Sequence, residues 1–203
     1  MGQWQGELDE LVEPATTAVL AIDVQQAFTT LPGLYPALDE MLPRLAAFLD
    51  AAHRAGVLVV RVRIVVPTET YSTNWQRQFS RTFQSLMAPD QPGVAFHPGF
   101  EPRPDDLTLI KHRYSAFCGT PLTSILHGRG VRTVIACGLT TDVCVGSTAR
   151  DAYQQDFQVI TLRDCTAEVT RAQHESGLAT LAMNFGLVCS SADVVAVWQD
   201  DAV

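Results

Sequence analysis

Short apolar segments alternate with amphipathic segments along most of the 203-residue chain. Apolar, partly β-branched runs typical of buried strands occupy residues 15–23, 57–63, 107–111, 132–138, 158–162 and 187–190. Apolar residues at helical spacing predict helices over residues 35–56, 120–130, 141–155 and 168–185. Strands and helices that alternate in this way form parallel sheets covered on both faces. We therefore expect a single α/β domain over residues 1–203, with a three-layer, Rossmann-like fold around a central six-stranded, mostly parallel sheet.

The stretch between residues 64 and 106 interrupts this alternation and contains six prolines. A connection of about forty residues inside a compact domain usually has a function of its own. Within it, residues 72–87 are predicted to form one helix with its apolar side chains on one side, at Trp75, Phe79, Phe83 and Leu86. Two interpretations stay open for this helix: a lid or subunit contact, or an ordinary packing helix.

The charge balance argues against nucleic acid as a partner. Fourteen basic and twenty-two acidic residues give a formal net charge of −8, and no Lys/Arg cluster offers a footprint for a phosphate backbone. The N-terminal residues lack the cationic and apolar regions of a signal peptide, and no apolar run approaches the roughly 18 residues of a membrane span. We expect a cytoplasmic protein that binds neither nucleic acid nor membrane.

Five cysteines are spread widely along the chain, at positions 118, 137, 144, 165 and 189. Their number is odd, and they form neither a CxxC pair nor the short spacing of a zinc site. Reduced thiols are therefore expected, and most free cysteines are simply small apolar core residues. A catalytic role for any one of these cysteines must therefore be supported by the residues around it.

Three residues of types that act in catalysis lie at or just after the ends of three predicted strands. Asp23 ends the first strand, Lys111 ends the third, and Cys144 follows the strand at 132–138 through a short turn. Ligands of open parallel sheets bind beyond the carboxyl ends of the strands. If the strands at 15–23 and 132–138 are neighbours, Asp23 and the Cys144 turn face one another across about 5 Å. The long side chain of Lys111 can reach them from a strand farther away.

The three residue types suit nucleophilic catalysis. A thiol attacks a carbonyl as thiolate, and a neighbouring carboxylate can take its proton. With Thr141 as the helix cap, Cys144 would lie in the first turn, where the helix dipole and Lys111 are expected to lower its pKa. Each residue alone also has an ordinary interpretation: a capping acid, a solvated lysine or a core thiol. Their joint placement favours catalysis.

The motifs around these residues resemble those of the isochorismatase-like cysteine hydrolase superfamily. They occur in order as AIDVQQAF at 21–28, KHRYSAFCGTPL at 111–122 and CGLTTDVCVGSTARDAY at 137–153. The resemblance implies a catalytic triad of Asp23, Lys111 and Cys144 and a cis peptide bond between Leu139 and Thr140. It further implies an oxyanion hole made by the backbone N–H groups of Thr140 and Cys144, a small-molecule substrate, and assembly as a homo-oligomer.

Two features of the motifs narrow the expected chemistry. Nicotinamidase-like members carry a metal-binding Asp-x-His after the second strand, where this chain reads RVRIVVP at 61–67, and His97 and His112 are isolated. We therefore expect no metal and no cofactor. Vinyl-ether hydrolases of the family commonly lack a cysteine at position 144, so its presence favours hydrolysis of a C–N bond in a small amide, carbamoyl or ureido substrate through a thioester. The alternatives are isochorismatase-type vinyl-ether hydrolysis and, less favoured, a non-catalytic binding protein.

The substrate contacts are less constrained by the sequence. Gln26-Ala27 stands where the family usually has Asn-Asp, which removes one expected acid. Aromatic residues near the motifs are candidate walls of the pocket: Phe28, Trp75, Tyr114 and Phe117. Ordinary core packing is the alternative for each. Four arginines, which otherwise are surface charges, are candidates to pair with a substrate carboxylate: Arg61, Arg63, Arg77 and Arg81.

Overall fold

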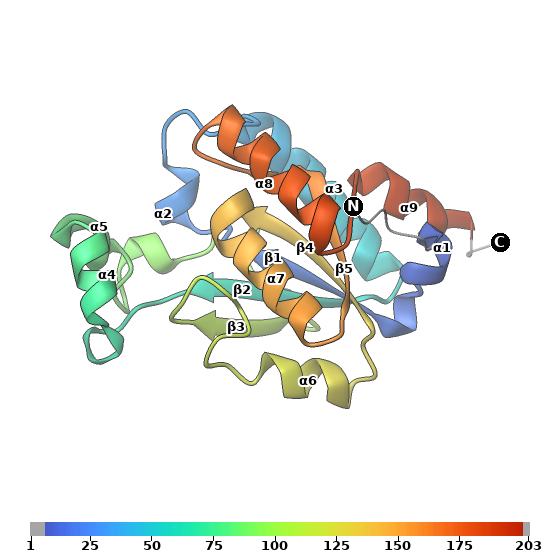
Figure 1. Ribbon diagram of the computed structural model, residues 1–203, viewed down its shortest axis with the longest axis horizontal. Coiled ribbons are helices and arrows are strands. Elements are labelled where there is room, and N and C mark those ends of the chain that lie inside the picture. The colour runs from blue at the N-terminus through green and yellow to red at the C-terminus, as the bar shows by residue number, and fades with distance from the viewer. Residues whose placement is uncertain (1–6, 201–203) are drawn as a thin grey trace.

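A sheet of six parallel strands forms the centre of the molecule in the computed structural model, which describes residues 7–200 (Figure 1). The strand order is β3-β2-β1-β4-β5-β6. The strands are β1 (Thr17–Ile22), β2 (Leu58–Ile64), β3 (Leu107–Lys111), β4 (Thr133–Leu139), β5 (Gln158–Ala167) and β6 (Leu187–Cys189). All five neighbouring pairs are parallel, which confirms the predicted six-stranded α/β fold and makes the sheet wholly rather than mostly parallel.

Helices cover both faces of this sheet and complete three layers. One face carries α1 (Leu8–Leu11), α3 (Leu38–Arg54) and α9 (Ser191–Asp200), and the other carries α6 (Leu122–Gly128), α7 (Gly146–Gln154) and α8 (Arg171–Asn184). Successive residues of β1 point to opposite faces, so that Val19 packs under α3 while Leu20 packs under α7. Both faces of the strand are buried, which explains why the strand sequences read as continuous apolar runs.

Residues 64–106 form an arm that projects from the carboxyl end of the sheet, at the left of Figure 1. It contains η2 (Thr68–Thr70), α4 (Thr73–Gln78), α5 (Arg81–Leu86) and η3 (Pro92–Val94), and α2 (Gln26–Thr29) lies against η3. The predicted single helix over 72–87 is wrong, because the chain is extended at Phe79. Ser80 then starts a new helix by accepting the Phe83 N–H at 3.2 Å. The arm has a small core of its own around Trp75 and Met87.

The helix expected at 141–155 also has two parts. Residues Thr141–Val145 form a wider turn, η4, in which the Val145 N–H donates to the Thr140 carbonyl at 3.1 Å, and α7 follows from Gly146. This turn carries Cys144.

The five cysteines are free thiols, and all except the exposed Cys118 are buried. None of the helices within residues 7–200 has the length and apolar character that a bilayer span requires. Cytoplasmic location therefore stays a prediction.

Candidate active site

The ends of β1 and β4 lie side by side because of one glycine. Ile22 is in register with Gly138, whose φ of 109° is unfavourable for residues with a side chain. A Cβ at this position would lie 2.0 Å from the carbonyl oxygen of Ile22. Only glycine therefore lets the two strands approach this closely, and the approach brings the segment after β4 against Asp23.

Asp23 and Lys111 form a fully buried ion pair at this edge of the sheet. Asp23 has a φ of 52°, a left-handed conformation that aspartate tolerates, and its N–H donates to the Val62 carbonyl at 2.9 Å. Lys111 Nζ lies 2.7 Å from Asp23 Oδ2. The same ammonium donates to the carbonyls of Arg113 at 3.1 Å and Tyr114 at 2.8 Å. The ammonium is thus held by two carbonyl acceptors and by the charge of Asp23.

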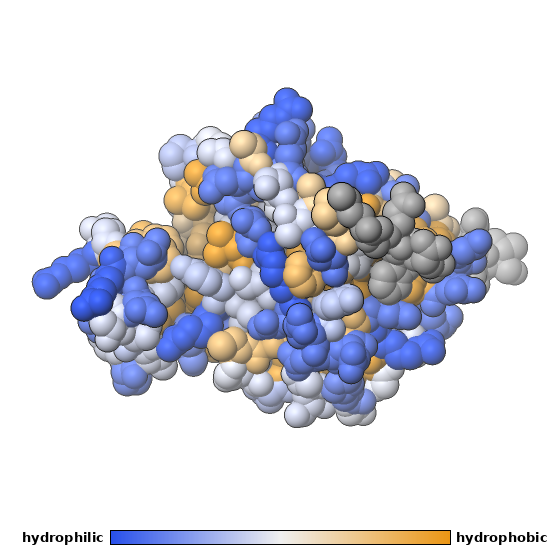
Figure 2. Space-filling model, in the orientation of Figure 1, coloured by the Kyte–Doolittle hydropathy of each residue, from blue (hydrophilic) through white to orange (hydrophobic). Residues whose placement is uncertain are grey.

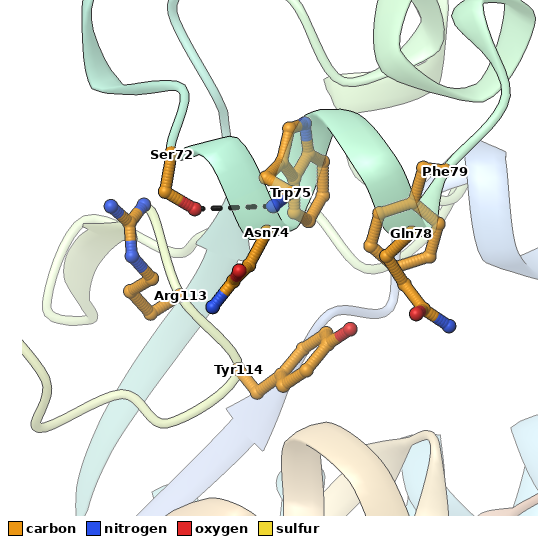
Figure 3. A pocket seen from close by; sticks show the side chains of 7 residues that line it. All are labelled: Ser72, Asn74, Trp75, Gln78, Phe79, Arg113 and Tyr114. Atoms are coloured by element: carbon orange, nitrogen blue, oxygen red, sulfur yellow. Dashed lines mark hydrogen bonds between the residues drawn. The ribbon is translucent and has the colours of Figure 1, made fainter.

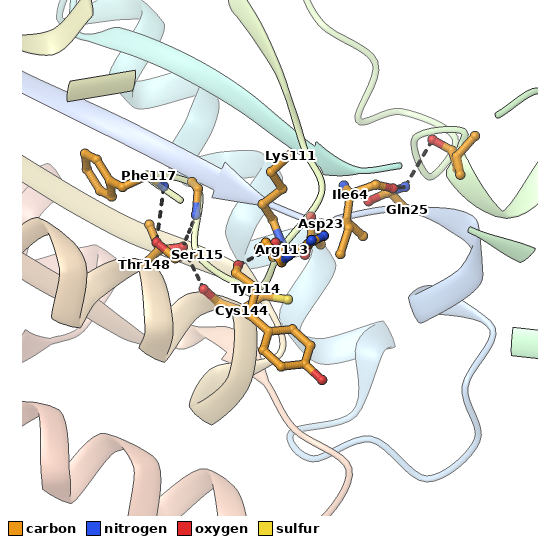
Figure 4. Close-up of polar contacts among 12 residues, drawn as sticks. Asp23, Gln25, Ile64, Lys111, Arg113, Tyr114, Ser115, Phe117, Cys144 and Thr148 are labelled. Atoms are coloured by element: carbon orange, nitrogen blue, oxygen red, sulfur yellow. Dashed lines mark hydrogen bonds and ion pairs between the residues drawn. The ribbon is translucent and has the colours of Figure 1, made fainter. Parts of the chain in front are cut away.

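Cys144 completes the group from η4. Its thiol is buried and lies beside both Asp23 and Lys111, whose charges act on it. Figure 4 shows the three side chains, which come from the ends of β1 and β3 and from the turn after β4, meeting at one point. The structure therefore brings together the three residues that the sequence singled out.

The pKa values of Asp23, Lys111 and Cys144 are all shifted, and the shift of the Cys144 thiol is opposite to the one expected from the sequence. Burial raises the pKa of the Cys144 thiol well above its ordinary value, and the negative charge of Asp23 raises it further, which Lys111 only partly offsets. The prediction of a lowered thiol pKa is therefore wrong for this structure. Burial also raises the pKa of Asp23 above 3.8 despite the charge of Lys111. Desolvation opposes the charge on Lys111, but attraction to Asp23 prevails and raises the pKa of Lys111 above 10.5.

The backbone before Cys144 contains a cis peptide bond and then enters the turn η4. The Leu139–Thr140 peptide bond is cis. Thr140 is the cap residue of η4 and Cys144 lies in its first turn, where no preceding turn offers acceptors for backbone N–H groups. Thr141 was the predicted cap, but its hydroxyl instead contacts Nδ1 of His174 at 2.8 Å.

Two residues that the sequence did not single out hold this turn from outside. The buried carboxylate of Glu168, just after β5, accepts the Asp142 N–H at 3.0 Å and the Val169 N–H at 2.8 Å. His174 on α8 contacts Thr141, and burial lowers its pKa. These residues fix the position of η4 relative to β5 and α8. Their only sequence signal is an acid at a strand end and a histidine on a helix.

Gln25 has a similar role on the other side of the site. Its fully buried amide donates to the carbonyls of Ile64 at 3.0 Å and Val94 at 3.1 Å and accepts the Ile64 N–H at 2.8 Å. All three bonds join the segment after Asp23 to the two ends of the arm. A glutamine in the first motif was visible in the sequence, but its partners were not.

A cavity of about 590 Å³ lies between the arm and the site (Figure 3). Its lining consists of Ser72, Asn74, Trp75, Gln78, Phe79, Arg113 and Tyr114. Two of the four predicted wall residues, Trp75 and Tyr114, therefore line this cavity, and their contact with a substrate stays a prediction. Phe28 packs edge-on against Phe83 of the arm, and Phe117 lies in the core on the α6–α7 face.

The four arginines chosen as possible carboxylate partners do not line this cavity. Arg61 pairs at 2.8 Å with Asp106, and both side chains are buried, so it is not a surface charge and already has a carboxylate partner. Arg63 lies over an aromatic ring of the arm. Arg77 and Arg81 are exposed on α4 and α5. The cavity contains a different arginine, Arg113, which lies within the second motif.

The side chains of His97 and His112 each contact a neighbouring polar group of the protein. His97 Nδ1 lies 3.0 Å from the Thr29 hydroxyl, and His112 Nδ1 lies 2.6 Å from the Val65 carbonyl. Across the part of the chain that the structure describes, no three His, Cys, Asp or Glu side chains are grouped to hold a metal ion. A metal-free enzyme stays a prediction.

Comparisons with known proteins agree with this geometry. The model of the isochorismatase domain family matches residues 17–193. A ureidoacrylate amidohydrolase of Methylorubrum extorquens is 32% identical over 92% of this chain and 84% of its own length. A maleamate amidohydrolase of Pseudomonas putida is 31% identical over 88% of this chain and 84% of its own. The crystal structure of a cysteine hydrolase from Pseudomonas syringae pv. phaseolicola superimposes with a TM-score of 0.84 at 29% identity, covering 92% of this chain and 94% of that one.

Proposed function

This chain belongs to the isochorismatase family and is a hydrolase of non-peptide C–N bonds, and we propose that it cleaves small amide, carbamoyl or ureido substrates through a thioester on Cys144. The observation that carries the mechanism is the contact of the Cys144 thiol with a fully buried Asp23–Lys111 pair. A carboxylate kept out of water beside a thiol has one evident use, which is to exchange a proton with it.

Acylation begins with the transfer of the Cys144 proton to Asp23. The resting thiol is protonated because burial raises its pKa, so the thiolate forms as the carbonyl carbon approaches. Sulfur then bonds to that carbon and the carbonyl oxygen becomes an oxyanion. The N–H groups of Thr140 and Cys144 are proposed to donate to this oxyanion, and one such donor is typically worth about 100-fold or more in rate.

The intermediate collapses when Asp23 returns its proton to the departing nitrogen. The C–N bond breaks, ammonia or an amine leaves, and the acyl group stays on Cys144 as a thioester. Asp23, again a carboxylate, removes a proton from water, and the resulting hydroxide attacks the thioester carbonyl. The product leaves as a carboxylic acid from an amide or as carbamic acid from a carbamoyl or ureido substrate, and Asp23 returns its proton to the thiolate. Lys111 takes no proton in this cycle, since its raised pKa keeps it charged; it holds Asp23 in place and favours its charged form.

The relatives favour this chemistry over vinyl-ether hydrolysis. Their names describe two amidohydrolases, and both substrates named are small carboxylic acids that carry a ureido or amide group. The cysteine at position 144 provides the nucleophile that amide cleavage requires. Isochorismate hydrolysis and binding without turnover remain the alternatives for the experiment to exclude.

A screen of ammonia release tests this function. Wild-type protein is expected to release ammonia from at least one of maleamate, ureidoacrylate and simple carbamoyl amino acids, and not to hydrolyse isochorismate. Cys144→Ala should reduce turnover at least 1,000-fold while leaving the folded state intact. Cys118→Ala removes an exposed thiol outside the site and serves as the matched control, with unchanged activity expected. Activity retained by Cys144→Ala, or turnover of isochorismate alone, would contradict the proposal.

We also propose that the protein forms a homo-oligomer in solution. The arm carries the exposed Leu86 and the half-buried rings of Phe79 and Phe83. Figure 2 shows hydrophobic surface gathered where the arm meets the rest of the molecule. Light scattering after size exclusion should give a mass of two or more times 22.1 kDa, and a monomer at micromolar concentration would contradict this proposal.

A further inference from the structure

The cavity beside the arm carries a positive charge in a protein that is acidic overall. Of the described residues that line it, Arg113 alone is charged at neutral pH, and none is an aspartate or glutamate. The whole chain has a formal net charge of −8. A cationic cavity in such a chain favours anionic ligands over neutral ones of the same shape.

The guanidinium of Arg113 is held in a fixed position without a carboxylate partner. Its Nη1 donates to the His112 carbonyl at 2.7 Å and its Nη2 to the Thr70 carbonyl at 3.2 Å. Of the five N–H groups of a guanidinium, three remain for other acceptors. Within residues 7–200 no carboxylate lies within ion-pair distance of Arg113, whereas Arg61 and Arg150 each have one.

The same loop joins this cavity to the catalytic group. Lys111 donates to the carbonyls of Arg113 and Tyr114, so the residues that hold the catalytic ammonium also line the cavity. Burial raises the pKa of the Tyr114 phenol, so the ring is neutral beside the nucleophile at neutral pH. Figure 4 shows the Tyr114 ring beside Cys144. The cavity is therefore lined both by Arg113 and by Tyr114, the ring that lies beside the thiol.

We propose that Arg113 binds a carboxylate of the substrate, so that the enzyme is specific for amides or ureides of small carboxylic acids. This inference rests on the proposed function and adds a substrate class to it. Trp75 and Phe79 provide apolar walls for the hydrocarbon of the substrate, and Figure 3 shows Asn74 projecting from α4 beside Arg113. A planar guanidinium held by two carbonyls suits the two oxygens of a carboxylate.

Paired ligands that differ only in charge test the proposal without requiring turnover. Binding to the Cys144→Ala protein is measured by calorimetry for maleamate against its neutral diamide maleamide, and for 3-ureidopropanoate against 3-ureidopropanamide. We expect at least one carboxylate to bind about 10- to 100-fold more tightly than its neutral partner, the ratio that one charge-assisted pair usually provides. Adding Arg113→Gln should abolish this ratio, and Arg113→Lys should restore part of it. Arg77→Gln, at an exposed arginine on the same arm, should leave the ratio unchanged.

The charge preference distinguishes recognition from a structural role. If Arg113 only held Thr70 and the arm in place, Arg113→Gln would weaken both members of a pair equally. That result would overturn the proposal, as would equal binding of both members, no binding of either pair, or a preference that survives in Arg113→Gln. The proposed function fails separately, when wild-type protein turns over no amide or ureide at all. Turnover without a charge preference would refute the role of Arg113 alone.

Discussion

The Asp23 carboxylate and the Lys111 ammonium meet at 2.7 Å with neither side chain exposed, although they come from strands separated by β2. Breaking a buried ion pair leaves a charge without a partner and commonly costs about 3 to 5 kcal/mol. Lys111→Met and Asp23→Asn should each lower the free energy of unfolding by roughly this amount and abolish activity. Urea denaturation followed by circular dichroism measures the loss.

The double variant is the control for this interpretation. In Asp23→Asn/Lys111→Met no buried charge remains, so its stability should exceed that of the less stable single variant by at least about 1 kcal/mol. Strictly additive losses would show that the two side chains contribute independently. Cys144→Ala should leave the unfolding free energy within about 1 kcal/mol of wild type, because it removes a single small group.

The pH dependence of catalysis should follow Asp23. Because the pKa of this carboxyl is raised above 3.8, it gains a proton as pH falls through that raised value and can no longer accept one from Cys144. The rate constant kcat/KM is therefore expected to fall on the acid side with a midpoint above pH 3.8. The raised pKa of Lys111 predicts no loss from that residue up to about pH 10. A rate that instead rises tenfold per pH unit above pH 7 would show that hydroxide, not Asp23, forms the thiolate.

Gly138 should tolerate no side chain. Its φ of 109° and the 2.0 Å contact between an added Cβ and the Ile22 carbonyl force β1 and β4 apart at the site. Gly138→Ala is expected to lose more than about 4 kcal/mol of stability, or to fold with activity reduced at least 100-fold. Gly128→Ala is the matched control, since that glycine has open space around it and lies at the end of α6. Equal thermal stability and activity of the two variants would contradict this account of the sheet.

Glu168 should support catalysis from outside the cavity. Glu168→Gln replaces one acceptor oxygen by an NH₂ group, which turns a donor toward the N–H of Asp142 or Val169. An unsatisfied buried N–H costs about 1 to 3 kcal/mol, and displacement of η4 should lower kcat more than it raises KM. Steady-state kinetics and urea denaturation measure both effects. Glu175→Gln, at an exposed acid on α8, should change neither the kinetic constants nor the stability. An equal loss in Glu175→Gln would contradict a specific role of Glu168.

The sequence predicted the sheet well because each strand has a strong local signal. The apolar run at 107–111 matches β3 to the residue, and the order of Asp23, Lys111 and Cys144 along the strand ends placed them on one edge before any contact was known. The helix at 72–87 failed because its apolar spacing continues across Ser80. The residues around Ser80 do not show whether this serine caps a new helix or lies inside a longer one.

The remaining misses concern partners that are distant in sequence. Glu168 reaches the turn before Cys144 across 26 positions, and Gln25 reaches Val94 across 69. The wrong pKa expectation for Cys144 has the same origin: a helix terminus is visible in the sequence, but burial beside Asp23 is not. Arg113 was overlooked because its neighbours in the sequence show no cavity, which forms only when the arm packs over the loop after β3.

The central claim, that Cys144 carries the acyl group, is tested most directly by mass spectrometry of protein quenched in acid during turnover. With maleamate or another substrate found in the screen, wild-type protein should gain the mass of the acyl group on the peptide that contains Cys144, on the time scale of product formation. Cys144→Ala should gain no mass and form no product. Product formation by Cys144→Ala at a rate comparable to wild type, or an acyl adduct on a different residue, would contradict the thioester mechanism.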